Sequence, residues 1–268
     1  MNRQTLRPFL KWAGGKRWLF QSGQFKLPTF DGRYFEPFLG GGAIFFRYLP
    51  KPAILSDSNE RLIELFLVVR DHPEALEAHM RAHAQAHTKE YYYELRSRQL
   101  RTPRARAAQF LYLNRTCWNG LYRENRKGQF NVPIGTKDSV LLDDDDFQAW
   151  SRALNGIRLE HRDFELAIDE AERGDFIFVD PPYTVRHNMN GFVKYNQNIF
   201  AWDDQVRLHA ALQRAHERGV SFAMTNADHE SIRELYAGFG THRQVERYSV
   251  IASKSSFRNP STELLVTV

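Results

Sequence analysis

The residues best suited to chemistry are Asp180, Pro181, Pro182 and Tyr183, which directly follow the apolar run Phe176–Val179. Continuous β-branched and aromatic runs are typical of buried parallel strands, and open α/β sheets carry their chemistry just beyond the carboxyl ends of such strands. A carboxylate and the carbonyl between two prolines can each accept one N–H from a planar exocyclic amine, while an aromatic ring stacks on the base. The placement therefore predicts an active-site rim for alkylation of such an amine. For an isolated Asp-Pro-Pro, a strand-to-turn junction with a capping aspartate is the alternative.

A glycine turn near the N-terminus predicts a ligand site. The apolar stretch 34–39 turns on Gly40, Gly41 and Gly42 into an apolar helix start, and glycines there let the backbone approach a ligand closely. After a second apolar run comes Asp57, placed as the acid that binds ribose hydroxyls at the end of the second strand of a nucleoside-binding βαβ unit. Phe45 stands where the third glycine of G-x-G-x-x-G would be, so the ligand need not be a dinucleotide.

Three further segments accompany these motifs in a fixed order. Phe9–Lys16 reads FLKWAGGK, a middle stretch over 113–135 contains LNR, WNGLYR and GQFNVPIG, and Thr225-Asn226 follows DPPY. With the glycine turn and Asp57, this set resembles the DNA adenine methyltransferases of the Dam type, from about residue 9 to the end of the chain. The resemblance implies S-adenosylmethionine as the cofactor and double-stranded DNA as the substrate. It also implies a monomer that acts by flipping its target base.

The expected fold is α/β, a Rossmann-like methyltransferase domain with an inserted, mainly helical target-recognition domain. The discontinuous catalytic domain is expected over 1–58 and 151–268, and the insertion over 59–150. Apolar residues recur at helical spacing between 60 and 101, and Thr102-Pro103 is typical of an N-cap followed by proline at the first helical position. Four acids, Asp143 to Asp146, predict a turn and a helix N-cap before Phe147.

The resemblance assigns roles residue by residue. The expected catalytic residues are Asp180, Pro181, Pro182 and Tyr183. The cofactor is expected to contact Trp12, Lys16, Phe38, Gly40, Gly42, Asp57, Asp163, Phe164 and Asp180. DNA is expected to contact Lys11, Arg104, Arg106, Arg115, Trp118, Asn119, Arg123 and Arg126, with Trp118 filling the gap left by the flipped base. GATC is the leading target sequence, although Thr136 stands where relatives that read GATC tend to carry an arginine.

The charge distribution favours an anionic partner. The 268-residue chain has a formal net charge of +5 and a pI of about 9.3. Nine basic residues stand against the single acid Glu124 between Arg96 and Lys127, where aromatic and asparagine side chains suited to bases are interleaved. This stretch is expected to face phosphates. A solvated helix face is the alternative.

Other features of the sequence exclude some classes of protein. One cysteine rules out an intramolecular disulfide and fits a reducing compartment, and no apolar run reaches the length of a membrane span. The N-terminus lacks the apolar core of a signal peptide, so a cytoplasmic, nucleoid-associated enzyme is expected. His79, His83 and His87 share a helical spacing but are expected to form a solvated face, and no metal site is expected. Cys117 is expected to be a structural thiol.

Three functions from different classes remain open at this point. The first is a DNA adenine methyltransferase, and the second is an amino-methyltransferase that acts on cytosine, RNA or a protein glutamine. The third is a DNA-binding regulator without catalysis. Aspartate before Pro-Pro-Tyr favours the first over the second, by resemblance to how these families differ. The intact Asp57, glycine turn and DPPY disfavour the third.

Overall fold

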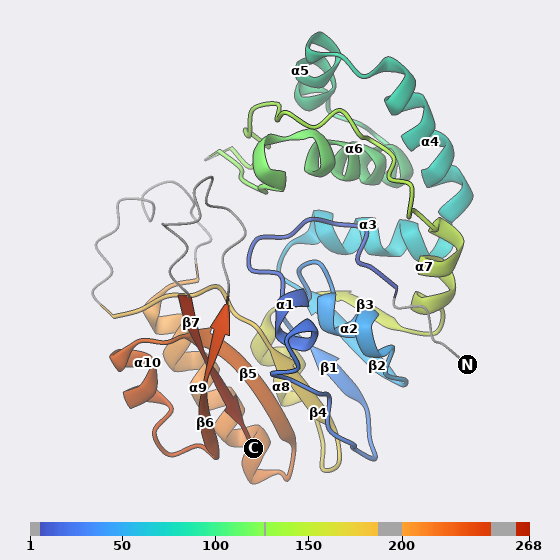
Figure 1. Ribbon diagram of the computed structural model, residues 1–268. Helices are drawn as coiled ribbons and strands as arrows, with labels where there is room; N and C mark the ends of the chain where they lie inside the picture. The colour runs from blue at the N-terminus through green and yellow to red at the C-terminus, as the bar shows by residue number, and fades with distance from the viewer. Residues whose placement is uncertain (1–5, 126, 187–199, 248–260) are drawn as a thin grey trace.

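A seven-stranded sheet forms the centre of the computed structural model, which describes residues 6–125, 127–186, 200–247 and 261–268 (Figure 1). Its strands run in the order β3-β2-β1-β4-β5-β7-β6. Neighbouring strands from β3 to β5 are parallel, and β7 is antiparallel to both of its neighbours. The strand bounds are β1 Tyr34–Glu36, β2 Ala53–Asp57, β3 Arg158–His161, β4 Phe176–Val179, β5 Ser221–Ala227, β6 Thr241–Arg247 and β7 Ser261–Thr267.

The central strand β4 shows why the sheet must be covered on both faces. All four of its residues are buried, and side chains alternate between the faces of a strand. Phe176 and Phe178 belong to one apolar cluster, while Ile177 and Val179 belong to the other. A strand that is apolar on both sides is stable only between two layers of helices, which is the arrangement of a Rossmann-like fold.

Helices form these two layers. Apolar side chains of α8 (Phe164–Asp169), α9 (Trp202–Glu217) and α10 (Glu230–Leu235) belong to the cluster on one face. The cluster on the other face includes side chains from α1 (Arg17–Gln21), α2 (Ala43–Tyr48), α3 (Glu60–Asp71) and α7 (Phe147–Leu154). The predicted α/β, Rossmann-like fold is thus confirmed.

The chain between β2 and β3 is helical. It forms α3, α4 (Pro73–Ala86), α5 (Lys89–Ser97), α6 (Pro103–Thr116), the 3₁₀ turn η1 (Trp118–Gly120) and α7. The Thr102 hydroxyl accepts a hydrogen bond from the N–H of Ala105 at the start of α6, and Asp146 accepts one from Ala149 at the start of α7. Both predicted N-caps are therefore confirmed. Whereas α3 contacts β2 and β3, helices α4–α6 lie farther from the sheet (Figure 1).

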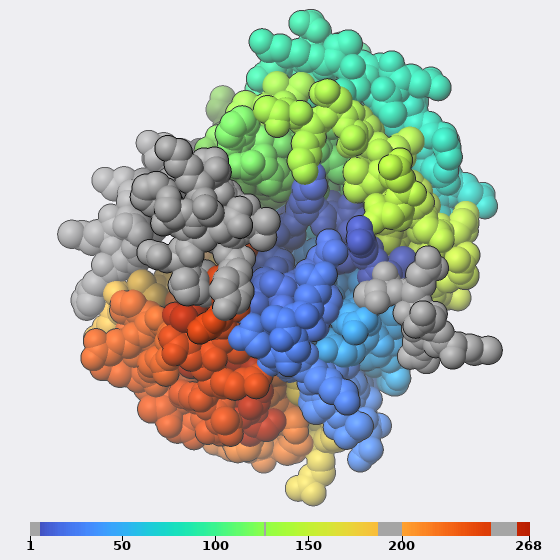
Figure 2. Space-filling model, viewed as in Figure 1, coloured from blue at the N-terminus to red at the C-terminus, as the bar shows by residue number. Residues whose placement is uncertain are grey.

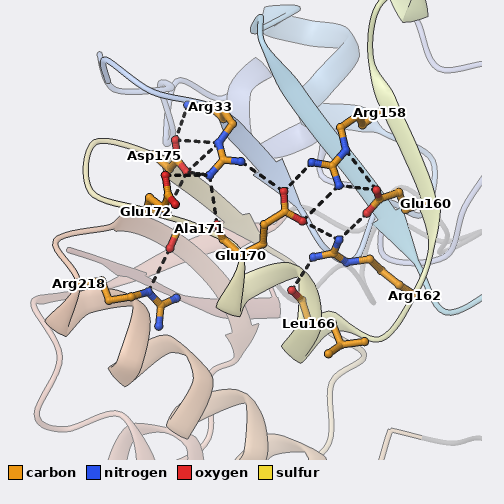
Figure 3. A network of polar contacts seen from close by, with 10 residues as sticks. All are labelled: Arg33, Arg158, Glu160, Arg162, Leu166, Glu170, Ala171, Glu172, Asp175 and Arg218. Carbon is orange, nitrogen blue, oxygen red and sulfur yellow. Dashed lines mark hydrogen bonds and ion pairs between the residues drawn. The ribbon is translucent and has the colours of Figure 1, made fainter.

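An ion-pair network ties the edge strand β3 to the neighbouring loops (Figure 3). Glu170, at the end of α8, bonds guanidinium groups of Arg158, Arg162 and Arg33 at 2.6, 2.8 and 3.3 Å. Arg33 also pairs with Asp175 at 2.8 Å, just before β4. The network therefore connects β3 and the residue after it with the segments that lead into β1 and β4.

The N-terminal segment that precedes β1 lies between the sheet and the helices that connect β2 to β3. Figure 2 shows this segment, in blue, between the orange and red C-terminal half of the sheet and the green and cyan helices of the insertion. Within this segment, Lys11 bonds Asn114 of α6 and Lys16 pairs with Glu263 of β7, so the segment contacts both the helices and the sheet.

Candidate active site

A cavity of about 930 Å³ opens beside the carboxyl ends of β1, β2 and β4. Its size falls within the range of small-molecule and cofactor sites. All of the predicted catalytic and cofactor-binding residues line it except Gly42, which is the N-cap residue of α2 and has φ +67°. The sheet thus brings together side chains that are up to about 170 positions apart in the sequence, as expected for the carboxyl edge of a parallel sheet.

The glycine turn is fixed against one wall of this cavity. Gly40 has φ +48°, and a Cβ atom there would lie 2.7 Å from Cδ1 of Trp12, so only glycine fits. The Asp57 carboxylate accepts the N–H of Gly40 at 3.0 Å and that of Asn59 at 2.9 Å. Burial raises the pKa of Asp57, and these backbone bonds oppose that effect. From the end of β2, Asp57 therefore holds the glycine turn that follows β1.

An aromatic stack joins the cavity to the helical insertion. The Trp12 ring stacks on Tyr122 with centroids 5.6 Å apart and on Phe110 of α6 at 6.3 Å. Tyr122 and Phe110 also stack on each other at 5.0 Å. Stacked aromatic pairs add stability beyond the area that they bury. The wall formed by Trp12 is therefore supported by residues of the insertion.

Asp180 is held on one side by two partners. Its Oδ1 atom lies 2.9 Å from the Lys16 ammonium and accepts the Thr225 hydroxyl at 2.8 Å. Lys16 is only 3% exposed and also donates to the carbonyl of Gly14 at 2.7 Å. Burial raises the pKa of Asp180, and the Lys16 charge opposes the rise. Both contacts fall on Oδ1, so Oδ2 remains available as a hydrogen-bond acceptor.

Tyr183 is held by an acid that the sequence analysis did not identify. The Tyr183 hydroxyl donates to Oε2 of Glu263 on β7 at 2.5 Å, and the Lys16 ammonium lies 4.9 Å from the centre of the tyrosine ring. Glu263 is 4% exposed and lies 3.5 Å from Lys16. Burial and the charges of Asp180 and Glu263 raise the pKa of Tyr183, which keeps its hydroxyl protonated. Glu263 thus fixes the ring beside Asp180.

Phenylalanines surround Asp163 at another part of the wall. The Asp163 side chain caps α8 by accepting the N–H of Glu165 at 2.9 Å. The next residue, Phe164, stacks on Phe38 with centroids 5.2 Å apart, and Phe200 meets Phe38 edge-on at 5.7 Å. An acceptor beside three apolar rings can bind the edge and the face of a heteroaromatic base.

Glu36 is a second acid that the sequence analysis missed. It ends β1, lines the cavity, is 4% exposed and accepts the Tyr34 hydroxyl at 2.8 Å. Burial raises the pKa of Glu36 to about 8, and the Asp180 charge adds to this rise. A glutamate inside the apolar stretch 34–39 was the available signal, because an ionisable residue on a buried strand is rarely without a role.

Comparison with known proteins assigns the family. Residues 12–250 match the model of the D12 class N6 adenine-specific DNA methyltransferases. The chain belongs to this family. It is 38% identical to the type II methyltransferase M1.LlaDCHI of Lactococcus lactis subsp. cremoris over 99% of this chain and 96% of that relative. It is also 32% and 30% identical to the DNA adenine methylases of Vibrio cholerae and Escherichia coli, over 97% of this chain in both cases and 95% and 94% of the relatives.

Membership confirms the resemblance deduced from the motifs. The protein is a site-specific adenine DNA methyltransferase that uses S-adenosylmethionine, and DNA is its substrate. The residues present fit this cofactor, because the cavity has a suitable volume and combines a glycine turn with strand-end carboxylates.

Asn114 brings several predicted DNA-binding residues of the methyltransferase together. Its side-chain amide accepts the N–H of Lys11 at 3.0 Å and donates to the Lys11 carbonyl at 2.7 Å and the Gly120 carbonyl at 3.4 Å. The turn held in this way presents Trp118 with half of its surface exposed, and Asn119 with a left-handed φ of 56°. Arg123 follows, exposed, and donates to Asn131 at 2.8 Å.

Two of the arginines assigned to DNA pair with carboxylates of the protein. Arg115 is 2% exposed and bonds the Asp145 carboxylate at 2.5 and 2.8 Å, so its prediction as a DNA contact is wrong. A buried guanidinium needs a carboxylate partner, and Asp145 lies 30 residues away in the sequence. Arg106 pairs with Glu64 and thereby joins α6 to α3. Arg104 is exposed at the start of α6, and Arg126 lies outside the described residues.

The remaining chemically notable side chains have structural partners. His83 is buried and contacts the Tyr91 hydroxyl at 2.7 Å, so the predicted solvated face is wrong for this residue. Burial lowers the pKa of His83 to about 4. Cys117 is buried, and burial raises the pKa of its thiol to about 11. Within the described ranges, no cluster of three or more His, Cys, Asp or Glu could hold a metal ion. No helix there is long and apolar enough to cross a membrane.

Proposed function

We propose that the enzyme methylates the 6-amino group of an adenine flipped out of double-stranded DNA, within the sequence GATC. The observation that supports this most strongly is the geometry of Asp180. Its carboxylate lies partly exposed at the carboxyl end of β4, is held through Oδ1, and is followed directly by the Pro181 carbonyl. Two acceptors in this order suit an amine that carries two N–H groups.

The catalytic residues would act on the amine as follows. Oδ2 of Asp180 and the carbonyl of Pro181 each accept one N–H, which draws the nitrogen lone pair out of the ring. Pro182 stiffens this turn, and Tyr183, anchored by Glu263, stacks on the base. S-adenosylmethionine supplies a methyl group already activated on a sulfonium sulfur. The raised pKa of Asp180 suits its carboxylate to take the proton that the methylated amine loses.

The remaining cavity residues would hold the cofactor. Asp57 is proposed to bind the ribose hydroxyls, and the carboxylate of Asp163 the 6-amino group of the cofactor's adenine. Trp12, Phe38 and Phe164 provide apolar contacts, while Gly40 and Gly42 shape the turn. Lys16, buried between Asp180 and Glu263, anchors the N-terminal segment over the site.

Target recognition is proposed for the insertion, residues 59–150, together with Lys11. Flipping costs a few kcal/mol of stacking and pairing, and Trp118 would fill the gap. Lys11 and Arg123 are proposed to read guanines, with Asn119 and Arg104 contacting the duplex. Burial and the neighbouring Lys137 lower the pKa of Lys11. Lys137 is proposed to supply the positive charge that Thr136 lacks. We also propose a monomer that works in the cytoplasm on the chromosome.

Sequencing of methylated DNA tests the reaction and the target together. DNA from a methylation-deficient host that expresses the protein should carry N6-methyladenine in GATC. An adenine motif other than GATC would refute the specificity and leave the chemistry standing, whereas modified cytosine alone would refute both.

A pair of variants tests the catalytic residue. Asp180→Ala should abolish methyl transfer from labelled S-adenosylmethionine while binding of DNA persists. Asp228→Ala is the matched control, since Asp228 also follows a strand of the sheet but does not line the cavity. Transfer by Asp180→Ala within a few-fold of the control would remove Asp180 from the mechanism.

A further inference from the structure

Arg207 on α9 binds the carboxylate of Asp163, the residue that caps the start of α8. One guanidinium nitrogen of Arg207 bonds Oδ1 of Asp163 and the other bonds Oδ2, both at 3.0 Å. The guanidinium carbon also lies 4.4 Å from the centre of the Phe164 ring. Both arginine and aspartate line the cavity. A bidentate (two-pronged) hydrogen bond of this kind fixes the plane of a carboxylate as well as its position.

The contacts leave one particular acceptor site on Asp163. Its Oδ1 atom accepts the Glu165 N–H at 2.9 Å in addition to Arg207, so both of its lone pairs are used. Its Oδ2 atom accepts only Arg207 among these bonds, which leaves one lone pair. Because Arg207 sets the plane of the carboxylate, it also sets the direction of this remaining lone pair.

Arg207 is itself held in place by two further acids, Asp204 on its own helix and Glu165 on α8, whose Oε2 atom accepts from it at 3.3 Å. Asp204, one turn earlier on α9, accepts from Arg207 at 3.0 Å through Oδ1, and its Oδ2 atom accepts the Ala201 N–H at 2.8 Å. Carboxylates of both α9 and α8 therefore fix the orientation of the guanidinium. A side chain fixed in this way can orient a further partner, here Asp163.

We infer that Arg207 is a positioning residue that makes the cofactor site select a 6-amino purine, by aiming the free lone pair of Asp163 at the amino group of the cofactor. The inference rests on the proposed role of Asp163. A 6-oxo purine would place a carbonyl oxygen against this lone pair, where two acceptors face each other. The cofactor base should therefore be distinguished by a hydrogen bond that only the amino form can donate.

Arg207 should act on Asp163 mainly by orienting its carboxylate and only slightly through its own charge. Asp163 and Arg207 are 38% and 39% exposed, so solvent screens their mutual attraction. Loss of the charge alone would change the acceptor strength of Asp163 only slightly. Loss of the two-pronged bond frees the carboxylate to rotate about its remaining bond to Glu165.

The chain offers a closely matched control for this inference. Arg214, two turns farther along α9, makes the same kind of two-pronged bond to Asp169 at 3.1 and 2.8 Å and also bonds Glu165. Like Arg207, it joins α9 to α8 and is partly exposed at 42%. Arg214 does not line the cavity. It therefore reports on helix docking without the proposed effect on base selection.

Calorimetric titration of the DNA-free protein tests the inference. The ligands are S-adenosylhomocysteine and S-inosylhomocysteine, which differ in carrying an amino group or an oxygen at position 6. Wild type should bind the adenosyl compound about 10- to 100-fold more tightly, the range for a hydrogen bond to a charged group. Arg207→Met should reduce this ratio to below about threefold, mainly by weakening the adenosyl compound, whereas Arg214→Met should retain the wild-type ratio.

Further variants distinguish the possible failures. Arg207→Lys should retain part of the preference, because an ammonium can hold one oxygen of Asp163 but does not fix its plane. If Asp163→Asn abolishes the preference and Arg207→Met does not, the inference fails and the proposed role of Asp163 stands. If the wild-type protein binds the two compounds equally well, both the inference about Arg207 and the proposed role of Asp163 fail. An equal loss in Arg207→Met and Arg214→Met would show that helix docking is responsible and would overturn the inference.

Discussion

Replacement of Glu36 by glutamine should change how the stability of the protein depends on pH. The pKa of Glu36 is about 8 in the folded protein, against an ordinary value of 4.5. Between these values the unfolded chain releases the proton and the folded protein retains it, so rising pH favours unfolding. At 1.36 kcal/mol per pH unit, the difference in pKa corresponds to about 5 kcal/mol of stability lost between pH 4.5 and pH 8.

The Glu36→Gln variant keeps the shape of the neutral side chain and cannot ionise. Below pH 4.5 it should be about as stable as wild type, because both side chains are then neutral. By pH 8 it should be more stable than wild type, with a ceiling of about 5 kcal/mol. Urea unfolding followed by circular dichroism at several pH values measures this difference. Wild-type and variant stabilities that stay parallel from pH 5 to pH 8 would refute the assignment of a neutral Glu36.

Four further substitutions test separate parts of the structure. Asp57→Ala should raise the Michaelis constant for S-adenosylmethionine more than it lowers kcat, which steady-state kinetics will show; an unchanged constant would remove Asp57 from the cofactor site. Trp118→Ala should reduce the fluorescence gain of 2-aminopurine at the target base, and an undiminished gain would count against a wedge. Arg104→Ala should lower the slope of log affinity against log salt by about one, and an unaltered slope would mean that Arg104 faces solvent. Arg115→Met should cost about 3–5 kcal/mol in urea unfolding by leaving the Asp145 charge buried without its partner, and a loss below about 1 kcal/mol would contradict that.

The features that the sequence predicted well depend on residues close together in the chain. The DPPY motif directly follows the strand that positions it, and the glycine turn and Asp57 belong to one βαβ unit. Thr102 and Asp146 bond N–H groups three positions ahead, so their sequence neighbours reveal the caps. Local spacing and hydrophobic periodicity contain this information directly.

The features that the sequence did not predict depend on distant partners. Arg115 resembles the other arginines of its segment until Asp145 is brought beside it, and Arg106 likewise meets Glu64 from 42 positions away. Glu263 comes from the opposite end of the chain to Lys16. Charge counted along a sequence therefore overestimates the surface available to DNA, because the fold neutralises some of it internally.

The ion pairs along β3 have a consequence for the behaviour of the protein in concentrated solution. β3 is an outer strand of the sheet, and outer strands can pair with other molecules and start aggregation. Arg158 and Glu160 alternate with the buried Leu159 on this strand, and both are held by the network around Glu170. The Arg158 and Arg162 charges lower the pKa of Glu170, so the network should persist into mildly acidic solution. The ion-paired side chains on this edge should therefore disfavour pairing of β3 with the sheet of another molecule.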